Sequence, residues 1–136
     1  MVKMDIIYEG GLHCRLTHGP SGTVISTDAP KDNHGKGEAF SPTDLVAAAL
    51  GSCMITTMAL FAERHQVPLE GTKIEVTKEM IADPVRRIGK LGVYFHFPKG
   101  IPHDQRSALE RAALACPVHK SLDEKIIIEA KFDYPD

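Results

Sequence analysis

The sequence predicts an α+β fold with the element order βββ-α-ββ-αα-β and a long buried helix at its centre. Three observations predict it. Apolar and polar residues alternate through residues 2–27, residues 45–62 carry no charge, and alternation returns in the second half of the chain. No internal repeat or linker divides the 136 residues, so we expect one domain over residues 1–136.

The first third of the chain predicts a three-stranded meander. In residues 2–8 every second residue is apolar, which is typical of a strand with one buried face. Turn-forming residues at 10–11 and 19–22 set this segment apart from two further stretches. Residues 12–17 alternate in the same way, and residues 23–27 are mostly β-branched.

The clearest helix start follows a polar loop over residues 29–40. Ser41 can cap the helix, Pro42 suits the first helical position, and Asp44 completes a capping box. The uncharged residues 45–62 then form either a membrane span or a core helix buried on several sides. We favour the core helix, because strands flank it on both sides. Such a helix needs more cover than one small sheet gives, which suggests a homodimer.

The second half of the chain predicts a pair of strands, two helices and a last strand. Alternating stretches indicate the strands, and Pro117 interrupts the helical pattern. The expected elements are two strands joined around Asp83-Pro84, helices over residues 103–115 and 117–122, and a strand over residues 126–132.

Composition narrows the function classes. The net charge of −2 leaves no broad basic surface for nucleic acid. The sequence does not open with a basic run, an apolar stretch and a cleavage site, so we expect a cytoplasmic protein. Three cysteines do not suggest a disulfide scaffold, because thiols in the cytosol are more often buried, metal-bound or catalytic.

Cys116 directly precedes Pro117, and proline is favoured at the first position of a helix. We therefore predict that Cys116 is the N-cap of a short helix. Free backbone N–H groups at a helix N-terminus stabilise an anion, so we expect the pKa of the Cys116 thiol to be lowered.

Cys53 lies in the middle of the uncharged helix, after Gly51 and Ser52. These two residues lower helix propensity, so a packing or functional reason for them is expected. The alternative for Cys53 is a small buried apolar side chain. Cys14 shares an apolar strand face with Leu12, and for Cys14 we favour that core role.

Metal binding is a further alternative. Cys116 and His119 have a Cys-x-x-His spacing, but a closed zinc site usually has two such pairs and no second one is present. The sequence has no Gly-x-Ser-x-Gly elbow and no phosphate-binding loop. We expect no metal and no cofactor.

Two segments carry a resemblance to a known family: Ser41-Pro42-Thr43-Asp44-Leu45-Val46-Ala47-Ala48-Ala49-Leu50-Gly51-Ser52-Cys53 and Ala115-Cys116-Pro117-Val118-His119-Lys120-Ser121-Leu122. The sequence resembles the OsmC/Ohr family, which includes organic hydroperoxide reductases. The separation of 63 residues between the two cysteines fits the family, as does the order of strands and helices.

The resemblance implies an intertwined homodimer in which the two cysteines meet at the subunit interface. It also implies that Cys53 attacks an organic hydroperoxide and becomes a sulfenic acid, which Cys116 converts to a disulfide. An external dithiol, such as a lipoyl group, would then reduce the disulfide. This chemistry needs no metal or flavin.

One position departs from the family pattern. The hydroperoxide reductases carry a glutamate directly after the proline of the first motif, and here that residue is Thr43. In those enzymes the glutamate and an arginine from the N-terminal strands hold the reactive thiolate. Arg15, on the second expected strand, is our candidate for this cation. His13 and either Arg86 or Arg87 are weaker candidates. The chain is therefore closer to the OsmC-like branch than to the dedicated reductases.

We expect a cysteine-based peroxidase acting on organic hydroperoxides, with no nucleic-acid or membrane partner. The alternative is an OsmC-like protein that senses redox state or binds a hydrophobic ligand without peroxide turnover. A metal-dependent thiol protein is a third possibility.

Overall fold

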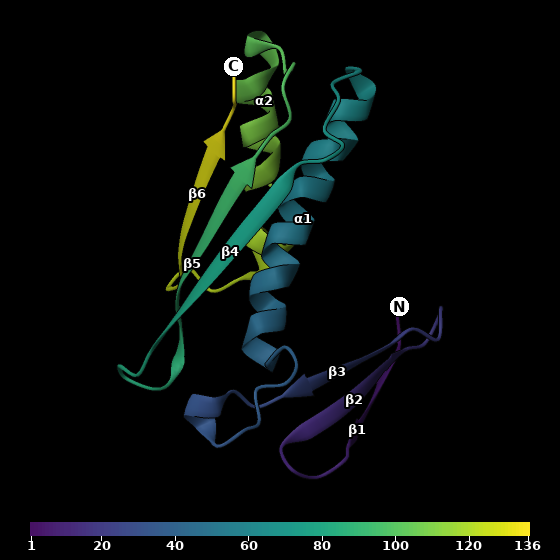
Figure 1. Cartoon of the computed structure of the whole chain (residues 1–136), viewed down its shortest axis with the longest axis vertical. Helices are drawn as coiled ribbons and strands as arrows, with labels where there is room; N and C mark the ends of the chain where they lie inside the picture. Colours follow the sequence, from purple (N-terminus) through teal and green to yellow (C-terminus); the bar gives the residue numbers. More distant parts are fainter. The chain divides into compact units, whose positions relative to one another are not determined.

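A computed structural model describes the whole chain, residues 1–136. The chain forms two compact units, residues 1–46 and 47–136, here called the N-terminal and C-terminal units. The elements follow the predicted order, so the α+β fold class is confirmed (Figure 1). That the chain is one domain stays a prediction. The elements are β1 (Met4–Tyr8), β2 (His13–His18), β3 (Val24–Asp28), η1 (Lys31–Asn33), α1 (Pro42–Arg64), β4 (Lys73–Ile81), β5 (Arg87–His96), α2 (His103–Leu114), α3 (Pro117–Ser121) and β6 (Ile127–Asp133).

The N-terminal unit contains the predicted meander. Its sheet has the order β1-β2-β3 with antiparallel neighbours. Ile6 pairs with Leu16, which in turn pairs with Ile25, so apolar side chains share one face across all three strands. Ile6 remains 63% exposed and Ile25 47% exposed. This face therefore has little cover from the chain itself.

The N-terminus of α1 is fixed by the predicted capping box. Ser41 Oγ accepts a hydrogen bond from the Asp44 backbone N–H at 3.0 Å, and Asp44 Oδ2 accepts one from the Ser41 N–H at 3.0 Å. Each side chain thus satisfies a backbone donor that the helix leaves without an internal partner. The capping-box prediction is confirmed, and the only unpredicted element is η1, one turn in the loop before Ser41.

Only one face of α1 is buried within the chain. The buried residues follow helical spacing: Ala47, Leu50, Gly51, Met54, Met58 and Ala62. Leu60 lies on another face and is 57% exposed. Burial on several sides, which was expected with the cover of a homodimer, stays a prediction, because one three-stranded sheet packs against only one helix face. By length and composition alone α1 could also cross a membrane, a test that core helices of soluble proteins pass too.

The C-terminal unit contains the second sheet, with the order β4-β5-β6. The long pair β4–β5 is antiparallel and β6 runs parallel to β5. Leu91, Val93 and Phe95 on the central strand are fully buried. From α2, Leu109 and Ala113 are fully buried as well. The core of this unit lies between the sheet and the two long helices (Figure 1).

Candidate active site

The structure brings Cys53 and Cys116 together in the C-terminal unit. Cys53 lies on α1 and is partly buried, and Cys116 lies between α2 and α3 with no exposed surface. The Cys53 side chain lies close enough to the Cys116 thiol to raise its pKa. Neither is in a disulfide. The pair is therefore a dithiol in which one sulfur is sealed by its own chain and the other is partly accessible.

The residues next to Cys116 in the sequence determine the position of its sulfur. Cys116 is the N-cap of α3, with an extended backbone (φ −65°, ψ 147°) and Pro117 at the start of the helix. Its Sγ accepts a hydrogen bond from the His119 N–H at 3.3 Å. The predicted N-cap is thus confirmed. The Val118 and His119 amides were not predicted as partners of the sulfur, although a capping cysteine before a proline implies free donors one turn on.

The predicted lowering of the Cys116 pKa is wrong. Burial removes the thiol from water and raises its pKa, because a thiolate is poorly solvated there. Hydrogen bonds from the His119 and Val118 N–H groups act in the lowering direction, while the neighbouring Cys53 adds to the rise. Desolvation of the sulfur outweighs the amides of one short helix.

The glycine near Cys53 has a packing explanation. A Cβ at Gly51 would lie 2.7 Å from Val76 Cγ2 and 3.4 Å from Ile74 Cγ2 on β4. Only a glycine lets α1 approach the sheet this closely at that point. Two residues further on, the Cys53 carbonyl accepts a hydrogen bond from Thr57 Oγ1 at 2.8 Å. The close approach of α1 to β4 therefore fixes the helix turn that carries Cys53.

Arg15 lies on β2 in the N-terminal unit. Its side chain is 48% exposed, and its Nε lies 3.9 Å from Glu9 Oε2. That Arg15 activates Cys53 stays a prediction. Among the weaker candidates, Arg87 donates from Nη1 to the Ile88 carbonyl at 3.3 Å, and its buried Nε has no partner. Arg86 lies in the turn between β4 and β5.

Thr43 and Cys14 are the two remaining positions that the sequence singles out. Thr43 lies in the first turn of α1, where its Oγ1 is 3.2 Å from Ser41 Oγ, so this hydroxyl takes part in the polar contacts of the helix cap. Cys14 lies on β2, in register between Tyr8 and Thr27, and is partly buried.

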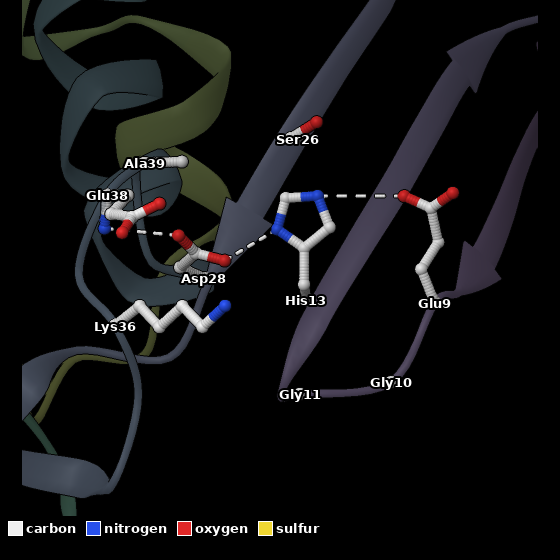
Figure 2. Close-up of a pocket in the computed structure, with 9 residues that line it drawn as sticks. All are labelled: Glu9, Gly10, Gly11, His13, Ser26, Asp28, Lys36, Glu38 and Ala39. Atoms are coloured by element: carbon white, nitrogen blue, oxygen red, sulfur yellow. Dashed lines mark hydrogen bonds and ion pairs between the residues drawn. The ribbon is translucent and has the colours of Figure 1, made fainter.

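A group of polar side chains lies in the N-terminal unit, around a cavity of about 510 Å³ (Figure 2). His13 Nδ1 is hydrogen-bonded to Asp28 Oδ1 at 2.5 Å, and its Nε2 lies 3.6 Å from Glu9 Oε1. Asp28 Oδ2 accepts the Glu38 N–H at 3.1 Å. The hydrogen bond from His13 holds the pKa of Asp28 below its usual value. Asp28 thus ties β2 to the loop that follows β3.

No group of three or more His, Cys, Asp or Glu side chains is arranged to hold a metal ion. The Cys-x-x-His spacing of Cys116 and His119 is explained instead by the cap of α3, in which the backbone of His119, and not its ring, contacts the sulfur.

Comparison with known proteins connects this geometry to a family. The sequence profile of OsmC-like proteins matches residues 35–131, a range that includes both Cys53 and Cys116. The chain belongs to the OsmC-like family. The resemblance inferred from the two cysteine motifs is therefore confirmed.

Solved structures of OsmC-like proteins share the fold over nearly the whole chain. A candidate osmotic stress induced and detoxification response protein from Psychrobacter arcticus 273-4 is 39% identical, with a TM-score of 0.92, covering 98% of this chain and 96% of that chain. The organic hydroperoxide resistance protein OsmC from Legionella pneumophila is 17% identical, with a TM-score of 0.78 and the same coverage of 98% and 96%. An OsmC-like protein from Mycoplasma pneumoniae is 15% identical, with a TM-score of 0.78 and again 98% and 96% coverage. No curated protein sequence matches the chain.

Proposed function

We propose that this OsmC-like protein is a thiol-dependent peroxidase that reduces organic hydroperoxides. The observation that carries the proposal is the contact between a partly exposed thiol, Cys53, and a buried one, Cys116. A two-cysteine peroxidase needs one sulfur that a small oxidant can reach and a second sulfur near enough to react with the first. The partial exposure of Cys53 and its closeness to Cys116 support the proposal.

In the proposed reaction the Cys53 thiolate attacks the peroxide oxygen that carries hydrogen. The O–O bond breaks, the alkoxide takes a proton and leaves as an alcohol, and Cys53 becomes a sulfenic acid. The Cys116 sulfur then displaces hydroxide from the Cys53 sulfur, which yields a disulfide and water. An external dithiol, for example a lipoyl group, returns both cysteines to thiols and is itself oxidised to a disulfide.

The names of structural relatives support this choice of substrate. The Legionella pneumophila relative is described as an organic hydroperoxide resistance protein, and the Psychrobacter arcticus relative as a candidate detoxification response protein. Peroxide attack also needs an ionised Cys53, and we propose Arg15 as the cation that favours the thiolate.

We further propose that the protein works as a homodimer in the cytoplasm, without a nucleic-acid or membrane partner. Two apolar surfaces support the dimer. One is the face of the β1-β2-β3 sheet that includes Ile6 and Ile25, and the other is the side of α1 that exposes Leu60. Exposed apolar area of this extent is typical of surfaces that a protein partner covers.

A peroxidase assay tests the proposal. Purified protein with a dithiol is expected to consume cumene hydroperoxide over many turnovers, and Cys53→Ser is expected to abolish this. Cys14→Ser is the matched control, because Cys14 lies on β2 and is expected to leave turnover unchanged. Turnover by Cys53→Ser at the wild-type rate would refute the assignment of the nucleophile.

A second function is favoured by Thr43. The threonine occupies the place where dedicated reductases have a glutamate, and its hydroxyl lies 3.2 Å from Ser41 Oγ in the helix cap. An OsmC-like protein without this carboxylate could use the cysteine pair as a redox sensor or bind a hydrophobic ligand, without turnover. In that case peroxide would form one disulfide per chain, and adding a dithiol would give no sustained consumption.

A further inference from the structure

The disulfide of the proposed cycle offers two sulfurs to the reductant, and the surroundings of those sulfurs differ. We infer that the reductant attacks the Cys53 sulfur and that Cys116 is the leaving thiolate. The inference rests on the proposed function, which supplies the disulfide and the external dithiol. It adds the direction in which the disulfide is opened and the residue that carries the mixed disulfide.

The first reason is that the reductant can reach the two cysteines to different degrees. Attack on a disulfide requires the incoming sulfur to approach along the axis of the S–S bond, so the attacked sulfur must be reachable. Cys116 has no exposed surface, and its own chain alone covers it. Cys53 is partly exposed in the same chain. A partner subunit could only add cover, so no dimer arrangement by itself uncovers Cys116.

The second reason is the set of hydrogen-bond donors around the sulfur that leaves as a thiolate. When the reductant bonds to Cys53, the electron pair of the broken S–S bond moves to Cys116. There the His119 N–H already points at the sulfur from 3.3 Å, and the Val118 N–H is a further donor. Attack in the other direction would place the charge on Cys53 in the middle of α1, where backbone N–H groups are engaged in the helix.

The titration of Cys116 agrees with this direction. Cys53 is one of the groups that raise the pKa of the Cys116 thiol. When Cys53 is bonded to the reductant it has neither a proton to share nor a charge. Burial still raises the pKa of Cys116, and the two amides still lower it. The thiolate of Cys116 is thus easier to form in the mixed disulfide than in the free dithiol.

Reduction then proceeds in two exchanges. One thiolate of the dithiol bonds to Cys53 Sγ while the Cys53–Cys116 bond breaks, and the Cys116 thiolate takes a proton. The second thiolate of the reductant attacks the reductant's own sulfur in the mixed disulfide. Its internal disulfide forms and Cys53 leaves as a thiolate. In total, two electrons pass from the dithiol to the two cysteines.

The experiment traps the intermediate with a monothiol, which cannot complete the second step. The Cys53–Cys116 disulfide is formed with diamide, so that no peroxide turnover is needed. It is then exposed briefly to 2-mercaptoethanol, quenched with acid, alkylated with N-ethylmaleimide and mapped by peptide mass spectrometry. We expect the 2-mercaptoethanol adduct on Cys53 and the maleimide on Cys116, in at least about tenfold excess over the reverse arrangement, the ratio that 1.4 kcal/mol would give.

An adduct mainly on Cys116, or equal amounts on the two cysteines, would overturn the inference, as would failure of diamide to form the disulfide. Absence of peroxide turnover with the expected adduct pattern would overturn the proposed function alone. The two failures are therefore distinguishable.

A matched pair of variants tests the amide donor. His119→Pro removes the N–H that contacts Cys116 Sγ, and His119→Ala keeps it. We expect His119→Pro to slow reduction of the disulfide about 3- to 10-fold and to raise the pKa of Cys116, whereas His119→Ala changes neither. Equal rates for the two variants would overturn the role of the amide. If His119→Pro does not fold, the mapping of the wild-type adduct still decides the direction of attack.

Discussion

The side chain of Cys116 lies beside that of Cys53, which is 63 residues earlier in the chain on a different helix. The contact joins a buried helix cap to the partly exposed side of α1. Cys53 raises the pKa of the Cys116 thiol across this contact. A substitution at Cys53 is therefore expected to shift the titration of Cys116.

Removing Cys53 is expected to lower the pKa of Cys116. Cys53 raises that pKa in the native pair, so Cys53→Ala deletes a raising contribution. The measurement is the ultraviolet absorbance of the thiolate against pH. It compares Cys14→Ala/Cys53→Ala with Cys14→Ala alone, so that Cys14 does not contribute. A pKa for Cys116 that stays the same or rises would contradict the described contact.

Gly51→Ala is expected to destabilise the protein, although alanine is the better helix former. The new methyl group would lie 2.7 Å from Val76 Cγ2, closer than real contacts allow. Overpacking of this kind costs about 1–3 kcal/mol, against a gain of about 1 kcal/mol in helix propensity. We expect a net loss of up to about 2 kcal/mol in the free energy of unfolding, measured with urea.

The control for this substitution is a double-mutant cycle with Val76→Ala, which removes the clashing methyl group. The double variant is expected to lose less stability than the two single variants added together. Strict additivity would show that Val76 is not what requires a glycine at position 51.

Ser41→Ala is expected to lower the free energy of unfolding by about 1 kcal/mol. The substitution removes the hydroxyl that accepts the Asp44 N–H at 3.0 Å and leaves a part-buried donor without this partner. Urea unfolding gives the value. Ser52→Ala is the matched control, because Ser52 is exposed on the same helix, and we expect it to change stability by no more than about 0.5 kcal/mol. Equal effects at the two positions would contradict the capping role.

Asp28 is expected to make stability depend on pH in the acid range. The hydrogen bond from His13 holds the folded-state pKa of Asp28 below its unfolded value of 3.8, so the unfolded chain binds this proton first as pH falls. The contribution of the ionised carboxylate is therefore complete well above pH 3.8 and is lost as pH falls through the folded-state pKa.

Comparison of wild type and Asp28→Asn, by urea unfolding from about pH 6 to pH 2, isolates this effect. The stability difference between them is expected to shrink toward low pH. Asp5→Asn is the control, because Asp5 lies on the surface of β1 and contacts only the exposed Lys3 at 3.8 Å. A difference between wild type and Asp28→Asn that does not change with pH would contradict the His13–Asp28 interaction.

Tyr134→Phe is expected to keep or slightly raise stability at neutral pH. The Tyr134 hydroxyl is buried without a hydrogen-bond partner, and burial raises its pKa to about 12. Removing an unsatisfied polar group removes its desolvation cost, while the ring keeps its stacking on Phe97 at 4.7 Å between centroids.

The same substitution changes the alkaline limb of the stability curve. In wild type the unfolded chain loses the Tyr134 proton near the ordinary tyrosine pKa of 10.0, before the folded chain does, so stability falls as pH rises from there toward about 12. Tyr134→Phe should remove this part of the fall. Tyr8→Phe is the control, since the Tyr8 hydroxyl accepts the Leu12 N–H at 3.3 Å and its loss should destabilise slightly.

Sequence reasoning was most accurate where neighbours along the chain decide the structure. The alternation in β1 and β2, the Ser41–Asp44 capping box and the Cys116 N-cap all depend on residues at most four positions apart. Backbone geometry fixes which of those residues face each other, so the pattern alone was sufficient.

Predictions from the sequence were less accurate where contacts between distant segments determine the structure. The cross-strand bond between His13 and Asp28 needs the register of β2 against β3, which the alternation does not specify. How much of α1 is buried depends on how many elements pack around it, and within the chain these elements cover only one face.

By itself, the sequence determined the order of the elements, the N-terminal caps of the two helices at which the cysteine motifs lie and, through those motifs, the family. Only the tertiary structure decided that Cys116 is sealed from water and that its pKa is therefore raised, against the effect of its own helix N-terminus. The physical reason is that hydrogen bonds at a helix end are local, whereas desolvation depends on every segment that packs over the sulfur.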